Sequence, residues 1–272
     1  MNALNNPNIF EANKLDYDYP GNIPALKQVS FNITPGEVVA LVGANGSGKS
    51  TLLKLMDGLI FAKSGELLAL GKPLSEERLK DKLFVREFRR KVGMVFQDPD
   101  VQLFSPTVWD EVIFGPLQLG ISKEEVIARG HAVLELMGIT HLRERPPYML
   151  SGGEKKKVSL ASVLSLQPRA LLLDEPTTGL DPSSQGNLID FLLKWAVDDK
   201  CLVFSTQDLD IVEEIATRVI VMGPEHNILA DGQPEDFLFD PDFLVRTNLI
   251  HEHSHRHKQL VHSHQHIHEH HY

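Results

Sequence analysis

The chain has 272 residues, of which 42% are hydrophobic, and a formal net charge of −10 when its histidines are neutral. This length and apolar content predict a soluble globular protein with one large domain or two small ones. The acidic balance argues against a general nucleic-acid binder, which needs a basic surface. No apolar run approaches the roughly 18–20 residues that cross a bilayer, and no signal-peptide pattern opens the chain. The single cysteine, Cys201, excludes an internal disulfide framework and suits a reducing cytoplasm.

Secondary-structure patterns alternate along most of the chain. Period-two alternation predicts strands over residues 15–19 and 29–33, and helical patterns fill the segment from about 107 to 165. Residues 75–91 are rich in Glu, Lys and Arg and predict a charged surface segment. Short apolar runs at 37–42 and 92–96 predict strands, and the continuous apolar runs at 170–173 and 202–205 are typical of parallel strands buried on both faces. The order of elements therefore predicts an α/β sandwich interrupted by a helical insert.

A phosphate-binding loop lies between the first apolar run and a helical segment. Residues Gly43 to Ser50 match the pattern G-x-x-x-x-G-K-[ST]. Glycines let consecutive backbone N–H groups surround an anion, and the N-terminus of the following helix favours negative charge. Lys49 is expected to reach the β- and γ-phosphates, and the Ser50 hydroxyl to ligate Mg²⁺. The strand–loop–helix context makes this the strongest site in the sequence.

Two further apolar strands end in polar residues that suit hydrolysis. Asp174 and Glu175 follow the run at 170–173. Asp174 is expected to hold Mg²⁺, and Glu175 to polarise the attacking water. Gln97, after the run at 92–96, can supply a neutral oxygen near Mg²⁺ and that water. Such residues carry weight here because a phosphate loop precedes them.

A second phosphate-binding pattern occurs at Leu150 to Glu154, which reads Leu-Ser-Gly-Gly-Glu. It combines an N-capping serine with two glycines and a following helix. One chain cannot fold both phosphate elements onto a single nucleotide. With this segment the chain resembles an ATP-binding cassette (ABC) ATPase, whose signature motif it matches, and the resemblance covers about residues 8–240.

The resemblance implies a P-loop NTPase fold with a RecA-like core, an N-terminal antiparallel β subdomain and a helical signature subdomain at about 107–165. The ABC domain is expected to span 1–245. Two subunits would then face head to tail, so that each signature helix caps the nucleotide bound by its partner's phosphate loop. Tyr19 matches the aromatic residue that stacks on adenine, with Tyr17 as an alternative.

The resemblance also assigns roles residue by residue, with ATP and Mg²⁺ as cofactors. The catalytic candidates are Glu175, Gln97 and Gln207, and the Mg²⁺ ligands are Ser50, Gln97 and Asp174. Asp181 belongs to the D-loop, which contacts the opposite subunit. The residues expected to contact nucleotide are Tyr19, Gly43, Ala44, Asn45, Gly46, Ser47, Gly48, Lys49, Ser50, Thr51, Ser151, Gly152, Gly153, Glu154 and Asp181.

One position departs from the family pattern. The family usually has a histidine after the last strand, in the order Ser-Thr-His-Asp, where this chain has Gln207. Histidine donates to the γ-phosphate and helps hold the attacking water. Glutamine can donate through its amide but cannot become cationic or carry a proton. The departure puts full catalytic competence in question and leaves nucleotide binding intact.

A narrower resemblance lies in the segment from Val95 to Pro116, which resembles the ATPases of energy-coupling-factor importers, especially the cobalt/nickel branch. It implies an ATPase that energises metal import from the cytoplasmic face of the membrane. The expected partners are a second ABC ATPase subunit, identical or not, and integral membrane coupling and substrate-binding subunits, with no nucleic acid. Residues Asp98 to Phe114 would carry the mechanical contact. The alternatives are a generic ABC insert, an importer of another micronutrient or vitamin, a soluble non-transport ABC ATPase, and a metal buffer.

Residues 246–272 form a tail that holds ten of the 13 histidines. Neutral imidazole suits Ni²⁺, Co²⁺, Cu²⁺ and Zn²⁺, and the low apolar content predicts disorder without metal. The alternatives are an expression tag and a solvated tail with incidental metal affinity. The candidate ligands are His251, His253, His255, His257, His262, His264, His266, His268, His270 and His271.

Overall fold

The computed structural model describes residues 8–197, 199–238, 240–249, 251–257 and 260–266. Its centre is a six-stranded sheet in the order β10-β9-β3-β8-β7-β6. Five strands run parallel, and β10 pairs antiparallel with β9 at one edge. The strands are β3 (Val38–Val42), β6 (Val92–Val95), β7 (Ala170–Asp174), β8 (Cys201–Thr206), β9 (Arg218–Met222) and β10 (Ile228–Gly232). The α/β core predicted from the sequence is therefore present.

A second, antiparallel sheet is built mainly from the N-terminal residues. Its order is β2-β1-β4-β5, and β1 pairs with both β2 and β4. The strands are β1 (Phe10–Tyr19), β2 (Ile23–Ile33), β4 (Ser64–Ala69) and β5 (Lys72–Pro73). This is the N-terminal β subdomain that the sequence predicted, completed by two strands that sequence patterns did not indicate.

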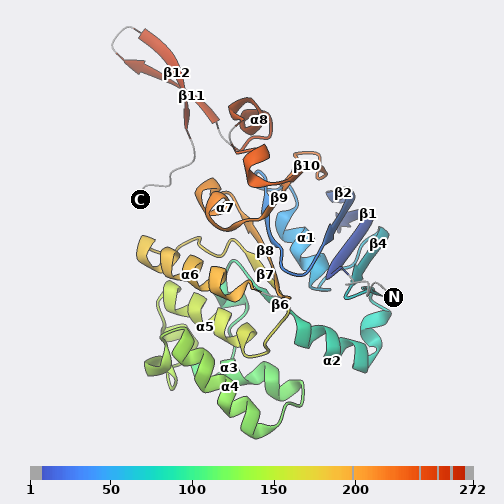
Figure 1. Ribbon diagram of the computed structural model, residues 1–272, viewed down its shortest axis with the longest axis vertical. Coiled ribbons are helices and arrows are strands. Elements are labelled where there is room, and N and C mark those ends of the chain that lie inside the picture. Colours follow the sequence, from blue (N-terminus) through green and yellow to red (C-terminus); the bar gives the residue numbers. More distant parts are fainter. Residues whose placement is uncertain (1–7, 198, 239, 250, 258–259, 267–272) are drawn as a thin grey trace, which may run out of the picture.

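Helices cover one face of the central sheet, and the smaller sheet lies on the other face together with the helix that follows β3 (Figure 1). Along β3 the side chains alternate: Val38 and Ala40 pack into one hydrophobic cluster, whereas Val39 packs into the other, which also includes the antiparallel sheet and the helix after the phosphate loop. Both faces are buried, which explains why these strands read as continuous apolar runs. The α-helices are α1 (Lys49–Met56), α2 (Lys82–Lys91), α3 (Val108–Gln118), α4 (Lys123–Leu136), α5 (Gly152–Leu164), α6 (Pro182–Trp195), α7 (Leu209–Ile215) and α8 (Pro241–Arg246).

Two further segments contain regular secondary structure. The charged segment 75–91 contains helix α2, whose Phe84 and Phe88, one turn apart, are buried and stack with ring centroids 5.9 Å apart. The backbone of the histidine tail forms a hairpin of β11 (His251–His257) and β12 (Leu260–His266). Alternation at period two, which recurs throughout the tail, is the pattern of a strand.

The cysteine lies in the middle of the core. Cys201 begins β8, between β3 and β7, and is fully buried. Burial in apolar surroundings raises the pKa of its thiol to about 12. The side chain therefore fills the core. No helix among the described residues is long and apolar enough to cross a membrane.

Candidate active site

The phosphate loop connects the end of β3 to the first turn of α1. A Cβ added at Gly48 would lie 2.4 Å from the Ala25 carbonyl oxygen, and one at Gly43 would lie 2.5 Å from the Met222 carbonyl oxygen. Gly48 also has a φ of 109°, in the left-handed region that favours glycine. Both close approaches require glycine, so the loop's path depends on these two residues.

Lys49 is held inside this loop. Its side chain is buried, and its Nζ donates to the carbonyl oxygens of Gly43 at 2.8 Å and Ala44 at 3.2 Å. Burial lowers the pKa of Lys49, while the carboxylates of Glu175 and Asp174 act in the opposite direction. An ammonium in a polar loop next to two carboxylates is placed to attract the phosphate groups of a nucleotide.

The predicted magnesium ligands meet where the parallel strands end. Ser50 Oγ donates to Asp174 Oδ1 at 2.9 Å, and Ser205 Oγ donates to the same oxygen at 2.6 Å. Gln97 and Ser50 line one pocket. A hydroxyl, a carboxylate and an amide are the oxygen donors that Mg²⁺ prefers, so these residues fit the ion. When bound, Mg²⁺ neutralises charge on the phosphates and polarises them.

Glu175 has an unusual backbone conformation beside this pair. Its φ is 45°, left-handed for a residue with a side chain. Its backbone N–H donates to Ser205 Oγ at 2.9 Å. Burial raises the pKa of Glu175, which the positive charge of Lys49 and a hydrogen bond with Gln207 partly offset. A raised pKa makes this carboxylate a better proton acceptor, as a general base requires.

These elements surround one pocket of about 350 Å³. Tyr19 lies on its wall, with its hydroxyl 3.0 Å from Thr51 Oγ1. Tyr17 packs edge to face on Tyr19 at 5.1 Å and is not among the lining residues, so the geometry favours Tyr19 for the adenine contact. The residues that line the pocket are Tyr19, Ile23, Pro24, Ala25, Asn45, Gly46, Gly48, Lys49, Ser50, Thr51, Gln97, Glu175 and His226.

Several of these residues were not predicted from the sequence. Ile23, Pro24 and Ala25 come from the start of β2, and His226 lies in the turn between β9 and β10. His226 has a φ of 62°, and its carbonyl oxygen accepts from the Lys27 N–H at 2.8 Å. No motif marks these positions, because only the pairing of distant strands brings them to the phosphate loop.

The signature residues lie elsewhere. Ser151 caps α5 in a capping box: its side chain accepts from the Glu154 N–H, and Glu154 Oε2 accepts from the Ser151 N–H at 2.8 Å. Asp181 caps α6 by accepting from the Ser184 N–H at 3.1 Å. None of Ser151, Gly152, Gly153, Glu154 and Asp181 lines the nucleotide pocket. The signature segment and the phosphate loop therefore lie at separate places in the fold.

Gln207 lies just after β8, where its Nε2 donates to Asn45 Oδ1 of the phosphate loop at 2.7 Å. We expect Gln207→His to raise ATP turnover about two- to tenfold, because a cationic imidazole forms a stronger, charge-assisted hydrogen bond with a γ-phosphate. Steady-state ATP hydrolysis by both forms is the measurement. Equal or lower turnover by Gln207→His would show that glutamine is fully adapted at this position.

Together these features define a phosphate-loop nucleotide hydrolase, in which Gln97, Asp174 and Glu175 lie at the strand ends beside the loop. The model of the ABC transporter family matches residues 26–178. An ABC transporter ATP-binding protein of Methanosarcina acetivorans is 51% identical over 92% of this chain and 91% of its own length. The chain therefore belongs to the ABC transporter family, and it is an ATPase.

Relatives of known type point to energy-coupling-factor transporters. The nickel import ATP-binding protein NikO of Rhodobacter capsulatus is 46% identical over 89% of this chain and 95% of its own length. The energy-coupling factor transporter ATP-binding protein EcfA of Methanoculleus marisnigri is 41% identical over 89% of this chain and 85% of its own length. Among solved structures, cbiO1 of Clostridium perfringens, part of the ABC transporter complex cbiONQ, superposes with a TM-score of 0.74 and 35% identity. That match covers 89% of this chain and 95% of cbiO1.

Proposed function

We propose that this chain is the ATP-hydrolysing subunit that energises import of cobalt or nickel through membrane partner subunits. Two such ATPase subunits, identical or not, would enclose two nucleotides at the cytoplasmic face of the membrane. Integral coupling and substrate-binding subunits would carry the metal. The likeness to a nickel import protein and to a member of a multi-subunit transporter complex supports this proposal. The proposal also agrees with the sequence of the Val95–Pro116 segment, which resembles the cobalt/nickel branch of the energy-coupling-factor ATPases.

The observation that carries the proposal is an apolar surface next to Gln97. We call it the docking patch and define it as Val101, Phe104, Phe114 and Leu117, which are 41–68% exposed. The rings of Phe104 and Phe114 pack edge to face with centroids 5.0 Å apart. Exposed apolar clusters of this kind mark protein–protein contacts. A membrane subunit that presses on this patch would act directly on the segment that follows Gln97.

A buried carboxylate fixes the backbone of the loop that carries part of the docking patch. Glu111 of α3 is buried, and its Oε2 accepts from the backbone N–H groups of Phe104 at 2.9 Å and Ser105 at 2.7 Å. Thr107 caps α3 by accepting from the Asp110 N–H at 3.1 Å. The loop that presents Phe104 is therefore fixed before a partner binds, which lowers the entropic cost of docking.

The patch provides the test of the proposal. We expect Phe104→Ala/Phe114→Ala to lose co-purifying membrane subunits and at least tenfold of Co²⁺ or Ni²⁺ uptake, since buried aromatic anchors dominate interfaces. Nucleotide binding should be unchanged, because neither residue lines the nucleotide pocket. Leu83→Ala is the matched control, since Leu83 is 80% exposed on α2, outside the patch.

Uptake assays with radiolabelled Co²⁺ and Ni²⁺ in cells that express the whole transporter distinguish the alternatives. Full association with the membrane subunits in the double variant would contradict the docking role. A transporter that moves neither ion but moves another micronutrient would replace the metal assignment and leave the docking role in place.

We also propose that the histidine tail binds transition metal independently of the ATPase. The candidates His251, His253, His255, His257, His262, His264, His266, His268, His270 and His271 lie outside the residues whose side chains the structure describes. Within the described part of the chain, no group of three or more His, Cys, Asp or Glu side chains could hold a metal ion. The tail composition therefore carries this proposal.

Deleting residues 251–272 is expected to leave ATP hydrolysis intact, because the nucleotide pocket is built from residues 19–226. Binding of Ni²⁺ and Co²⁺ should fall to the level of the remaining domain. In the intact chain, metal binding should be lost as the pH falls through about 6.5, because protonated imidazole cannot ligate. Calorimetric titration of both proteins at about pH 7.5 and 5.5 checks this, and equal metal uptake would refute the tail site.

A further inference from the structure

A buried lysine on the signature helix touches two parts of the catalytic site. Lys156 of α5 is 6% exposed. Its Nζ donates to the carbonyl oxygen of Gln97 at 2.9 Å and to that of Glu175 at 3.2 Å. Gln97 follows β6 and Glu175 follows β7, so neither residue belongs to the helix that holds them. One ammonium therefore joins the signature helix to the segment after β6 and to the general base.

The contact with Glu175 matters because the backbone there is strained. The left-handed φ of Glu175 persists only if its surroundings fix it. Ser205 Oγ accepts from its N–H on one side, and Lys156 donates to its carbonyl oxygen on the other. The two contacts together set the direction in which the Glu175 carboxylate leaves the main chain. Without Lys156, the peptide group after Glu175 would lose this donor.

A purely structural role explains Lys156 less well. An ammonium is costly to bury unless hydrogen bonds compensate it, and neighbouring inward positions on α5 are taken by Val158 and Leu160. Among the described residues Lys156 forms no salt bridge; both of its partners are backbone carbonyls at catalytic positions. Burial lowers its pKa, which the charges of Asp174, Glu175 and Asp98 oppose. Its position therefore serves the site rather than the core.

Two neighbouring contacts reinforce the same connection. Lys155 Nζ donates to Asp100 Oδ1 at 2.6 Å. Gln102 Nε2 donates to the Ser159 carbonyl oxygen at 3.0 Å, while its Oε1 accepts from the Phe96 N–H at 3.2 Å. The segment from Phe96 to Gln102 is thus tied to α5 at three points. A displacement of this segment would be transmitted to α5 and, through Lys156, to Glu175.

We propose that Lys156 is a positioning residue for ATP hydrolysis, which holds the backbone of Glu175 in its active direction and couples it to Gln97 and the signature helix. The proposal rests on the ATPase activity and is independent of the transported substrate. Lys156 does not line the nucleotide pocket, so it is expected to affect turnover and not nucleotide affinity.

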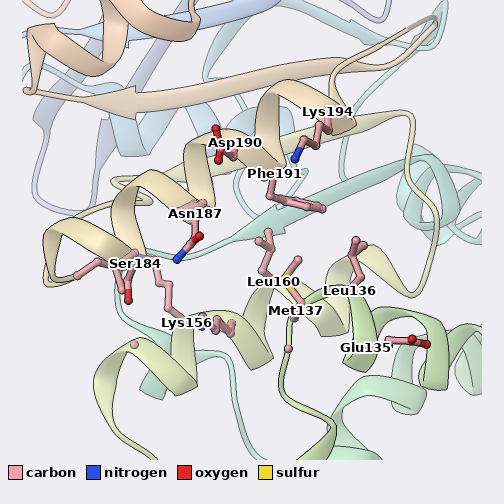
Figure 2. Close-up of a pocket in the computed structure, with 15 residues that line it drawn as sticks. Glu135, Leu136, Met137, Lys156, Leu160, Ser184, Asn187, Asp190, Phe191 and Lys194 are labelled. Carbon is pink, nitrogen blue, oxygen red and sulfur yellow. The ribbon is translucent and has the colours of Figure 1, made fainter.

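A cavity beside Lys156 allows a conservative test. It has a volume of about 380 Å³ and lies between α6 and the α4–α5 pair, with Lys156, Leu160, Ser184 and Phe191 among its lining residues (Figure 2). Arginine keeps the positive charge at this position, and its guanidinium can donate to two carbonyl oxygens. Methionine keeps the length of the stem and removes every donor.

The experiment measures kcat and KM for ATP in the full-length chain, together with nucleotide affinity and melting temperature. Lys156→Met is expected to lower kcat about ten- to a hundredfold, the range for a slightly misplaced catalytic group, with KM within about twofold. Lys156→Arg should restore most of kcat. Lys157→Met is the control, because this substitution removes the same charge from the next residue of α5.

Three results would overturn the proposal. The first is an unchanged kcat in Lys156→Met. The second is a loss of kcat that is matched by a similar rise in KM. The third is a Lys156→Arg protein as impaired as Lys156→Met. If Lys156→Met does not fold, Lys156→Gln takes its place, because its amide is too short to reach both carbonyls, and the same three criteria apply.

Discussion

Replacing Glu175 with glutamine is expected to reduce ATP hydrolysis about 10²- to 10⁴-fold, the usual contribution of a general base. An amide cannot accept a proton from the attacking water. Glutamine keeps the size and polarity of the side chain, so the contacts of the Glu175 backbone with Ser205 and Lys156 should persist. Nucleotide should therefore remain bound, and the variant should accumulate as a closed dimer with Mg-ATP.

Size exclusion with light scattering at saturating Mg-ATP, beside a hydrolysis assay, tests both parts. Glu76→Gln, at an exposed position remote from the site, is the matched control and should behave as the unmodified chain. A monomeric Glu175→Gln protein under these conditions would count against the head-to-tail arrangement. Undiminished hydrolysis would mean that another group accepts the proton.

Replacing Lys49 with alanine is expected to weaken ATP binding by about ten- to a hundredfold, and turnover should fall at least as much. This range corresponds to the loss of one or more hydrogen bonds to a charged group, each about 1.5–3 kcal/mol. The loop carbonyls of Gly43 and Ala44 lose their buried donor as well.

Calorimetric titration of ATP, with hydrolysis measured in parallel, checks the expectation for Lys49. Lys123→Ala removes the same charge from the exposed start of α4 and should leave both quantities unchanged. Normal hydrolysis by Lys49→Ala would show that the phosphate site is wrongly assigned.

The part of the site that follows from local motifs could be predicted from the sequence. A phosphate loop fixes its own geometry within a few residues, and parallel strands bring Gln97 and Asp174 to the same edge as Ser50. The structure places these residues as the sequence implied. The central sheet was predictable for the same reason, since continuous apolar runs mark strands buried on both faces.

The remaining part depends on contacts between distant elements. Lys156 reads as one of three consecutive lysines, and only the packing of α5 against the strand ends gives it a role. His226 enters the nucleotide pocket through a turn that no motif marks. Strands β5 and β10 are short edge strands, and little in their composition distinguishes them from loops.

The position of Cys201 gives the chain a built-in chemical reporter. Alkylating and oxidising reagents attack the thiolate. A thiol that is fully buried, with a pKa of about 12, is almost entirely protonated and therefore hardly reacts. Because β8 lies between β3 and β7, the sulfur becomes reachable only when the central sheet separates. The rate of thiol labelling therefore records how often the core opens, and a nucleotide that stabilises the folded chain should slow that rate in proportion to its occupancy.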